Sequence, residues 1–271
     1  MIMFKSLGGQ TVFLNTIYEQ QTSLLPYLNR YCKTLESRTR PFHSLSKLLR
    51  NPTAFTVIAE FKRRSPSNPL LHPHASVADM IGDYEKTSAS AYSILTESMY
   101  FGGIYDDLKT AASLTRRPIL NKDFIIDTVQ IDIAHKLGAD VILLIAALGD
   151  KIDLSSLSSY AKSKGLEVLI EVHGPSCIER IKDLDYDILG VNNRDLKSLK
   201  TNVEHTGKVL KLLPDRGVPI ITESGIRSTE DVRHLLDEQI SGALIGTAIM
   251  NATDKAGFIH TLVEVKGNDK S

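Results

Sequence analysis

Short apolar runs rich in strand-forming residues recur eight times from residue 56 onward, and amphipathic stretches separate them. Strand–helix alternation of this kind is typical of parallel strands joined by crossover helices. The runs lie at residues 56–61, 91–96, 119–122, 141–145, 168–172, 188–192, 219–223 and 243–245. Eight such units in a chain of 271 residues predict an α/β fold of the (β/α)8 TIM-barrel type, which needs about 250 residues.

Glycines and a capping serine mark the ends of three helical stretches. The stretch 130–137 ends at Gly138, and the stretch 154–164 ends at Gly165. Glycine adopts the left-handed conformation that commonly terminates a helix. The stretch 229–238 follows a serine, which is a preferred N-cap. These boundaries support helices between the predicted strands.

A doubly wound open sheet is the alternative arrangement for alternating strands and helices. Such sheets usually carry a glycine-rich dinucleotide loop after the first strand. Residues 63–69, which follow the first run, contain no glycine. We therefore favour the closed barrel.

The first 55 residues stand outside the alternation. Helices are expected over residues 23–33 and 44–50, separated by Arg40-Pro41. We see no linker that would divide the chain into two independent domains. The expected parts are an N-terminal helical extension at 1–55, the (β/α)8 barrel catalytic domain at 56–264 and a polar tail at 265–271.

The composition excludes several classes of protein. Formal net charge is zero, which gives no support for a nucleic-acid partner. No run approaches the ~20 apolar residues of a membrane span, and the N-terminus lacks a secretory pattern. Cys32 and Cys177 are too few for a disulfide framework or a cysteine metal site. His72 and His74 lack a matching carboxylate cluster, so we expect no metal. No cofactor is expected. The missing membrane span and secretory pattern predict a soluble cytoplasmic protein.

The first apolar run ends in an acid and a base two residues apart. Side chains in a strand alternate between faces, so Ile58, Glu60 and Lys62 share one face, whereas Val57 and Phe61 take the other. Burying two charged side chains in a strand costs free energy unless they form an ion pair or take part in function. On its own, the pair fits a structural ion pair as well as it fits a catalytic site.

The same alternation places polar side chains at the carboxyl ends of three further runs. Lys122, Glu171 and Asn192 each follow an apolar residue or glycine on the same face, and His173 and Arg194 lie two positions beyond the last two. Active sites of (β/α)8 barrels lie at the carboxyl ends of the strands. Four runs with this pattern favour a functional site over solvated loops. We interpret His173 as a residue of the cavity rim whose hydrogen bonds are satisfied.

Small and hydroxyl residues follow the last two runs. Ser224-Gly225 comes after the seventh run and Gly246-Thr247 after the eighth. The loops after strands seven and eight form the usual phosphate site of these barrels. Glycine lets the backbone approach an anion, and N–H groups at a helix start donate to it. Either pair alone is typical of a plain turn, but together they predict phosphate binding at Gly225, Gly246 and Thr247.

These residues stand in motifs that resemble the indole-3-glycerol-phosphate synthase family of tryptophan biosynthesis. The resemblance runs in order over about residues 56–250, and the N-terminal extension matches only loosely. The matching segments are 58–62 with 65–67, 93–97 with 101–103, 120–127, 138–145, 169–173, 190–196, 223–226 and 244–246.

The resemblance implies a substrate and a reaction. The substrate is 1-(2-carboxyphenylamino)-1-deoxyribulose 5-phosphate, which is closed to an indole ring with loss of carbon dioxide and water. The resemblance implies that Lys122 donates a proton to the C2′ carbonyl and that Glu171 is the base that completes the elimination. A lysine that loses its proton at working pH needs a neighbouring cation or partial burial to lower its pKa. Lys62 is a candidate for that cation; alternatively, it contacts the substrate carboxylate or serves in dehydration. Which lysine acts at which step stays open.

The same resemblance implies the remaining roles. Glu60 orients Lys62 and the substrate hydroxyls, Asn192 and Arg194 hold the intermediate, and Ser65 lies near the anthranilate carboxylate. Phe101 and Phe124 wall the aromatic ring. The expected catalytic residues are Glu60, Lys62, Lys122, Glu171, Asn192 and Ser224, and the expected substrate-binding residues are Ser65, Phe101, Phe124 and Arg194.

Three positions depart from the family pattern. Asn68-Pro69 replaces a usual glycine, Ile104 a usual serine and Asn121 a frequent arginine. Proline fixes φ and removes a donor, so we expect a stiffer loop after the first strand. None of these changes removes a catalytic group, and activity is expected.

Two hypotheses compete with this assignment. A phosphoribosylanthranilate isomerase-like barrel would carry a cysteine on the first strand and an aspartate on the sixth, where this chain has Glu60 and Asn192. A non-catalytic phosphate-binding barrel would not need Lys122 or Glu171. The expected partner is a phosphorylated small molecule, with no nucleic acid and no membrane. A monomer, in contact with other tryptophan-pathway enzymes, is also expected.

Overall fold

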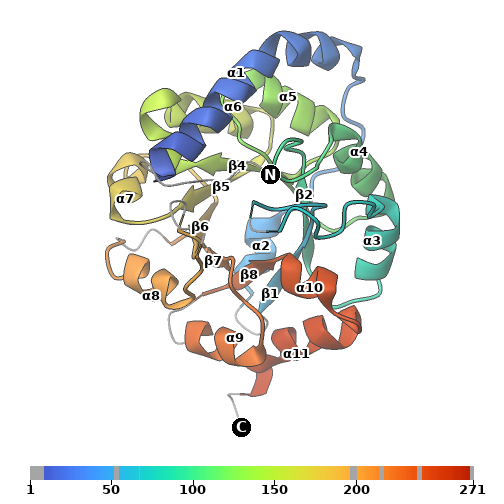
Figure 1. Ribbon diagram of the computed structural model, residues 1–271, viewed down its shortest axis with the longest axis vertical. Coiled ribbons are helices and arrows are strands. Elements are labelled where there is room, and N and C mark those ends of the chain that lie inside the picture. The colour runs from blue at the N-terminus through green and yellow to red at the C-terminus, as the bar shows by residue number, and fades with distance from the viewer. Residues whose placement is uncertain are drawn as a thin grey trace.

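The computed structural model describes residues 9–51, 55–66, 68–195, 200–213, 217–236 and 240–268. Ser67, Leu196 and Glu238, which fall within expected motifs or helices, lie outside these residues. Eight parallel strands close into a barrel in sequence order (Figure 1). The strands are β1 Thr56–Phe61, β2 Ala91–Leu95, β3 Ile119–Lys122, β4 Val141–Ile145, β5 Glu167–Val172, β6 Ile188–Asn192, β7 Ile220–Glu223 and β8 Gly242–Ile245.

The predicted barrel is confirmed, and each strand matches its predicted run to within one residue at either end. Closure comes from the parallel pairing of β1 with β8, in which Thr56 lies opposite Gly242 and Ala59 opposite Ile245. An open sheet would leave these two strands as edges.

Helices surround the barrel on its outer side (Figure 1). Gly138 and Gly165 have the positive φ expected of helix-ending glycines. The outer helices are α3 Val77–Tyr84, α4 Tyr105–Leu114, α5 Thr128–Lys136, α6 Leu154–Ser163, α7 Pro175–Ile181, α8 Glu204–Leu210, α9 Thr229–Leu236, α10 Thr247–Asn251 and α11 Lys255–Asn268, with a 3-10 segment η1 at Ala146–Lys151. The last helix continues past the boundary that we drew at residue 264.

Two hydrophobic cores lie on opposite faces of the barrel wall. Val57 and Phe61 belong to the outer core, between strands and helices. Ile58 belongs to the inner core, together with Leu120 and Leu169. The predicted alternation along β1 is therefore confirmed, and it points Glu60 and Lys62 into the barrel.

The extension begins with α1 Gly9–Thr34, which is longer than the helix predicted over 23–33. Phe13, Leu14 and Ile17 are buried in the inner core at the carboxyl end of the barrel. Burial of these side chains offsets the weak helix propensity of the glycine at the start of this segment. In Figure 1, α1 crosses one edge of the strand ring.

The second helix of the extension, α2 Leu45–Leu49, closes the opposite end of the barrel. Glu167, the first residue of β5, accepts hydrogen bonds from the backbone N–H groups of Leu45 and Ser46, each at 2.9 Å. Leu45 and Leu49 are buried in the inner core. Figure 1 shows α2 within the ring of strands.

A buried ion-pair cluster fastens the segment between α1 and α2 to the barrel. Arg38 Nη2 lies 2.7 Å from Asp140 Oδ1, and Arg40 Nη1 lies 2.5 Å from Asp140 Oδ2. Asp140 also accepts from the backbone N–H of Ile119, at the start of β3. The cluster ties the extension to the amino ends of the strands.

Candidate active site

A cavity of about 970 Å³ opens at the carboxyl ends of the strands. It is lined by residues of several strands, of the loops that follow them and of α1. Every predicted site residue lines it: Glu60, Lys62, Ser65, Phe101, Lys122, Phe124, Glu171, Asn192, Arg194, Ser224, Gly225, Gly246 and Thr247. Asn121 does not line it; its side chain is buried and donates to Thr96 Oγ1 at 2.8 Å.

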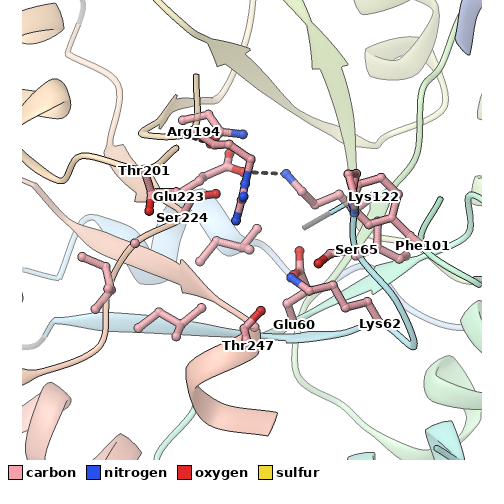
Figure 2. A pocket seen from close by; sticks show the side chains of 18 of the residues that line it. Glu60, Lys62, Ser65, Phe101, Lys122, Arg194, Thr201, Glu223, Ser224 and Thr247 are labelled. Carbon is pink, nitrogen blue, oxygen red and sulfur yellow. Dashed lines mark hydrogen bonds and ion pairs between the residues drawn. The ribbon is translucent and has the colours of Figure 1, made fainter. Parts of the chain in front are cut away.

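Lys122 lies at the centre of a buried charge cluster. Its Nζ is 3.0 Å from Glu171 Oε2 and 2.5 Å from Glu223 Oε2. Figure 2 shows the Lys122 ammonium reaching across the cavity toward Glu223. Burial would lower the pKa of Lys122, but Glu171, Glu223 and Glu60 outweigh it and raise the pKa above its usual value. The ammonium is therefore held charged.

This result differs from the expectation that a neighbouring cation lowers the pKa of Lys122. Lys62, which directly follows β1, is not that neighbour, because its ammonium pairs with Glu60 of β1. The two lysines thus have separate carboxylate partners on different strands. The raised pKa keeps Lys122 charged when substrate enters.

The pKa values of the two carboxyl groups beside Lys122 are shifted in opposite directions. Burial raises the pKa of Glu223 to about 8, and the charge of Glu171 adds to this rise while Lys122 opposes it. Burial also acts to raise the pKa of Glu171, but Lys122 and His173 outweigh it and lower the pKa to about 2. The cluster therefore holds one carboxylate and one carboxyl that is protonated near neutral pH.

Glycines on neighbouring strands make room for the charged groups. A Cβ at Gly190 on β6 would collide with Glu223 Oε1. A Cβ at Gly246, directly after β8, would collide with Glu60 Oε1 and lie 2.8 Å from Lys62 Nζ. Both carboxylates thus lie directly over a backbone that carries no side chain.

His173 lies beside Glu171 and is not the satisfied rim residue that we expected. Its Nε2 is 3.2 Å from Glu171 Oε1. Within the described part of the chain neither ring nitrogen has a hydrogen-bond partner. Burial lowers the pKa of His173 below its usual value, so the ring is held neutral at pH 7.

An apolar wall faces this cluster. The rings of Phe101 and Phe124 lie with centroids 6.3 Å apart at an interplanar angle of 37°. Phe13 and Leu14 of α1 also line the cavity, and Phe13 packs edge-on against Tyr100 at 5.2 Å. The wall suits a flat aromatic group.

The loop that carries Phe101 is held from two sides. Glu97 is buried, and its carboxylate accepts from the backbone N–H groups of Met99, Tyr100 and Phe101. The Phe101 carbonyl accepts from the N–H groups of Arg63 and Arg64, at 3.2 and 3.1 Å. The loops after β1 and β2 therefore support each other.

The turn after β1 lies directly before Pro69, the proline that departs from the family pattern. Ser65 and Asn68 exchange two backbone hydrogen bonds, each 3.0 Å long. The Ser65 hydroxyl also accepts from Asn68 N at 3.1 Å. These bonds hold a tight turn at the cavity edge.

The far end of the cavity has the backbone features of an anion site. Ser224 is the only non-glycine residue with positive φ in the described chain, at 67°, and Gly225 follows at 95°. Gly246 precedes α10, whose first residue is Thr247. Figure 2 places Ser224 and Thr247 on the side of the cavity away from Phe101. The aromatic wall and the predicted phosphate end thus lie on opposite sides of the charge cluster.

Asn192 and Arg194 occupy the mouth between these ends. Asn192 Oδ1 accepts from the backbone N–H of Arg194 at 3.0 Å. Figure 2 shows the Arg194 side chain extending into the cavity near Ser224. Burial lowers the pKa of Arg194, although Glu60 opposes this effect.

Several cavity residues were not among the predicted site residues. Glu223 could have been found, because it shares the inner face of β7 with Ile221 and ends its run as Lys122 does. Asp123 also lines the cavity, where burial raises its carboxyl pKa to about 6. No pattern in the sequence around Phe13 and Leu14 marked them as cavity residues. Among the described residues, no group of three or more histidine, cysteine or acidic side chains could hold a metal ion.

A closed (β/α)8 barrel with a lysine–carboxylate cluster at its mouth is a barrel enzyme equipped for acid–base chemistry. The family model of indole-3-glycerol phosphate synthase matches residues 16–262. The chain belongs to the indole-3-glycerol phosphate synthase family. This membership decides against the isomerase-like and non-catalytic hypotheses.

Curated relatives support the assignment. The indole-3-glycerol phosphate synthase of Staphylococcus haemolyticus (strain JCSC1435) is 44% identical over 207 residues, which cover 76% of this chain and 79% of the relative. That of Bacillus cereus (strain B4264) is 40% identical over 245 residues, which cover 90% and 95%.

Solved structures share the fold at low sequence identity. Thiamine phosphate pyrophosphorylase from Pyrococcus furiosus aligns with a TM-score of 0.60 at 17% identity, covering 82% of this chain and 100% of that one. 3-Hexulose-6-phosphate synthase from Salmonella typhimurium aligns with a TM-score of 0.62 at 15% identity, covering 78% and 98%. In the described residues, no helix combines the length and apolar character needed to cross a membrane.

Proposed function

We propose that the residues around Lys122 carry out the indole-forming reaction of this family on 1-(2-carboxyphenylamino)-1-deoxyribulose 5-phosphate. The observation that carries the assignment of roles is the contact of Lys122 with both Glu171 and Glu223 inside the cavity. A charged lysine between two carboxyl groups can give a proton to the substrate and regain a proton from a neighbouring carboxyl group.

Ring closure is the first step in this proposal. The aryl carbon that bears the carboxylate forms a bond to C2′, and Lys122 delivers a proton to the C2′ oxygen. Loss of carbon dioxide from the same aryl carbon then restores the aromatic ring. The raised pKa means that Lys122 is protonated at the start of the step, and its contacts with Glu171 and Glu223 hold that proton inside the cavity.

Dehydration is the second part of the reaction. Glu171, held ionised by Lys122, takes the proton from C1′. The C2′ hydroxyl leaves as water with a proton from a lysine, either Lys62 or Lys122. Glu60 orients Lys62 through their ion pair. Asn192, Arg194 and Ser224 are proposed to hold the intermediate and the sugar hydroxyls.

The substrate's two ends fit the two ends of the cavity. Phe101 and Phe124 provide an apolar wall for the anthranilate ring, with Ser65 near its carboxylate. The phosphate is proposed to lie against Gly225, Gly246 and Thr247, where backbone N–H groups and the start of α10 favour an anion. No cofactor enters the proposed steps.

Incubation with the carboxyphenylamino-deoxyribulose phosphate tests this function. Indole absorbance and fluorescence should appear together with one equivalent of carbon dioxide. Folded protein that produces no indole would contradict the proposed function. A monomer in the cytoplasm, in contact with other tryptophan-pathway enzymes, completes the proposal and rests on family membership; light scattering tests the monomer.

A further inference from the structure

A fully buried polar network lies behind the ends of β6 and β7. Asn193, directly after β6, is 3% exposed, and Thr206 on α8 and Thr222 on β7 are completely buried. None of these side chains lines the cavity. The network therefore lies behind the strand ends that carry Asn192 and Glu223.

Four hydrogen bonds among the described residues engage the Asn193 amide. Its Nδ2 donates to Thr222 Oγ1 at 2.8 Å and to the Ser224 carbonyl at 3.0 Å. Its Oδ1 accepts from Thr206 N at 3.1 Å and from Thr206 Oγ1 at 2.8 Å. An asparagine side chain has two donor hydrogens and two acceptor positions, so this amide is fully used.

The hydroxyl directions follow from this pattern. Thr206 Oγ1 gives its hydrogen to Asn193, so in its 2.9 Å contact with Thr222 Oγ1 it must accept. Thr222 therefore donates to Thr206 and accepts from Asn193, and the three side chains form a closed ring of hydrogen bonds. Aspartate at 193 could not supply the two donors.

Asn193 also holds two successive carbonyls of the turn after β7. Its backbone N–H donates to the Glu223 carbonyl at 2.9 Å, and its side chain donates to that of Ser224. Ser224 has φ of 67°, a left-handed conformation that is unfavourable for a non-glycine residue. Such a conformation persists only where its surroundings fix it.

We propose that Asn193 is a positioning residue that fixes Glu223 beside Lys122 and holds the Ser224–Gly225 turn open for the substrate phosphate. It acts through the two carbonyls and touches no substrate atom. The inference rests on the proposed function, since it gives that turn a part in phosphate binding.

Paired substitutions separate positioning from simple stability. Asn193→Asp loses the donor to the Ser224 carbonyl. Thr206→Val, its matched control, breaks the hydroxyl ring but leaves the contact between Asn193 and Ser224. We expect both to lower the Tm, whereas only Asn193→Asp should raise KM and lower kcat, each by roughly tenfold or more. KM and kcat within about twofold of those of Thr206→Val would overturn the proposal.

A binding measurement keeps the test independent of turnover. In a Lys122→Ala background, calorimetry should show that Asn193→Asp weakens substrate binding roughly tenfold, and an unchanged Kd contradicts the inference. Lack of turnover by the wild-type protein would instead contradict the proposed function.

A third variant covers the case in which Asn193→Asp does not fold. Asn193→Ser keeps a hydroxyl but is too short to reach the same partners. Ser224→Gly removes the cost of the left-handed conformation, so the Asn193→Ser effect on KM should shrink in the Ser224→Gly background. If the effects of Asn193→Ser and Ser224→Gly on KM are strictly additive, the two residues are not coupled and the proposal is wrong.

Discussion

The carboxylate of Glu223 occupies the space in which a side chain at Gly190 would lie. Gly190 is opposite Ile221 in the pairing of β6 with β7, so the glycine leaves room for the next inward-facing residue of β7. The Glu223 contact with Lys122 therefore depends on the absence of a single methyl group on the neighbouring strand.

Gly190→Ala should displace Glu223 and weaken its contact with Lys122. Overpacking of this kind costs about 1–3 kcal/mol, so we expect a lower Tm and a kcat reduced at least about tenfold. Gly82→Ala is the control, because a Cβ at Gly82 on α3 meets nothing within 4 Å. That variant should keep full activity. Equal activity of the two variants would contradict the packing argument.

Lys122→Ala should abolish indole formation, because the ring-closing step loses its proton donor. General acid catalysis contributes about 10²–10⁴-fold, and kcat should fall by that factor while substrate affinity stays within about tenfold. Lys122→Arg is the companion variant, since it keeps a cation that does not give up its proton. Steady-state kinetics and calorimetry provide both quantities. A Lys122→Ala protein that retains most of its kcat refutes the assigned role.

Glu223 should make the folded state less stable as pH rises toward 8. The pKa of this carboxyl is raised from 4.5 to about 8, so between these values the folded protein binds a proton that the unfolded chain does not. Stability therefore falls with increasing pH in this window. Glu223→Gln cannot titrate, and its Tm should decline less than that of the wild type between pH 5 and 8. Parallel Tm curves for the two proteins would show that the raised pKa is wrong.

Asp140→Ala should destabilise the fold without altering chemistry at the mouth. Removing Asp140 leaves Arg38 and Arg40 without their shared buried carboxylate, and such losses cost about 3–5 kcal/mol. Asp150→Ala is the matched control, because Asp150 is 89% exposed in its pair with Arg180 and should contribute less than about 1 kcal/mol. Urea unfolding measures both. A similar loss in the two variants would mean that the Asp140 cluster has no special role.

Strand positions were predictable because the alternation of apolar and polar residues is a local signal. The same alternation turned Glu60, Lys62, Lys122 and Glu171 toward the interior, and the cavity has all four in its lining. Their roles in catalysis stay a prediction. For these residues, the alternation of side chains along a single strand was enough to predict which way each side chain points.

Features that depend on distant segments were not predictable in this way. The start of α1 at Gly9 depends on burial of Phe13 and Leu14 against strands far along the chain. The expected lowering of the Lys122 pKa failed because neighbouring strands place carboxylates, rather than Lys62, around it. The Asn193 network joins β6, β7 and α8, and no single run of residues reveals it.

The extension reaches both ends of the barrel, with α1 at the cavity, and α2 and the Asp140 cluster at the opposite end. A cut near residue 55 would therefore uncover the inner core at two places at once and remove part of the apolar wall. For protein engineering, the extension is not a detachable module: a transplanted barrel needs residues 9–50 to keep its inner core covered and its cavity complete.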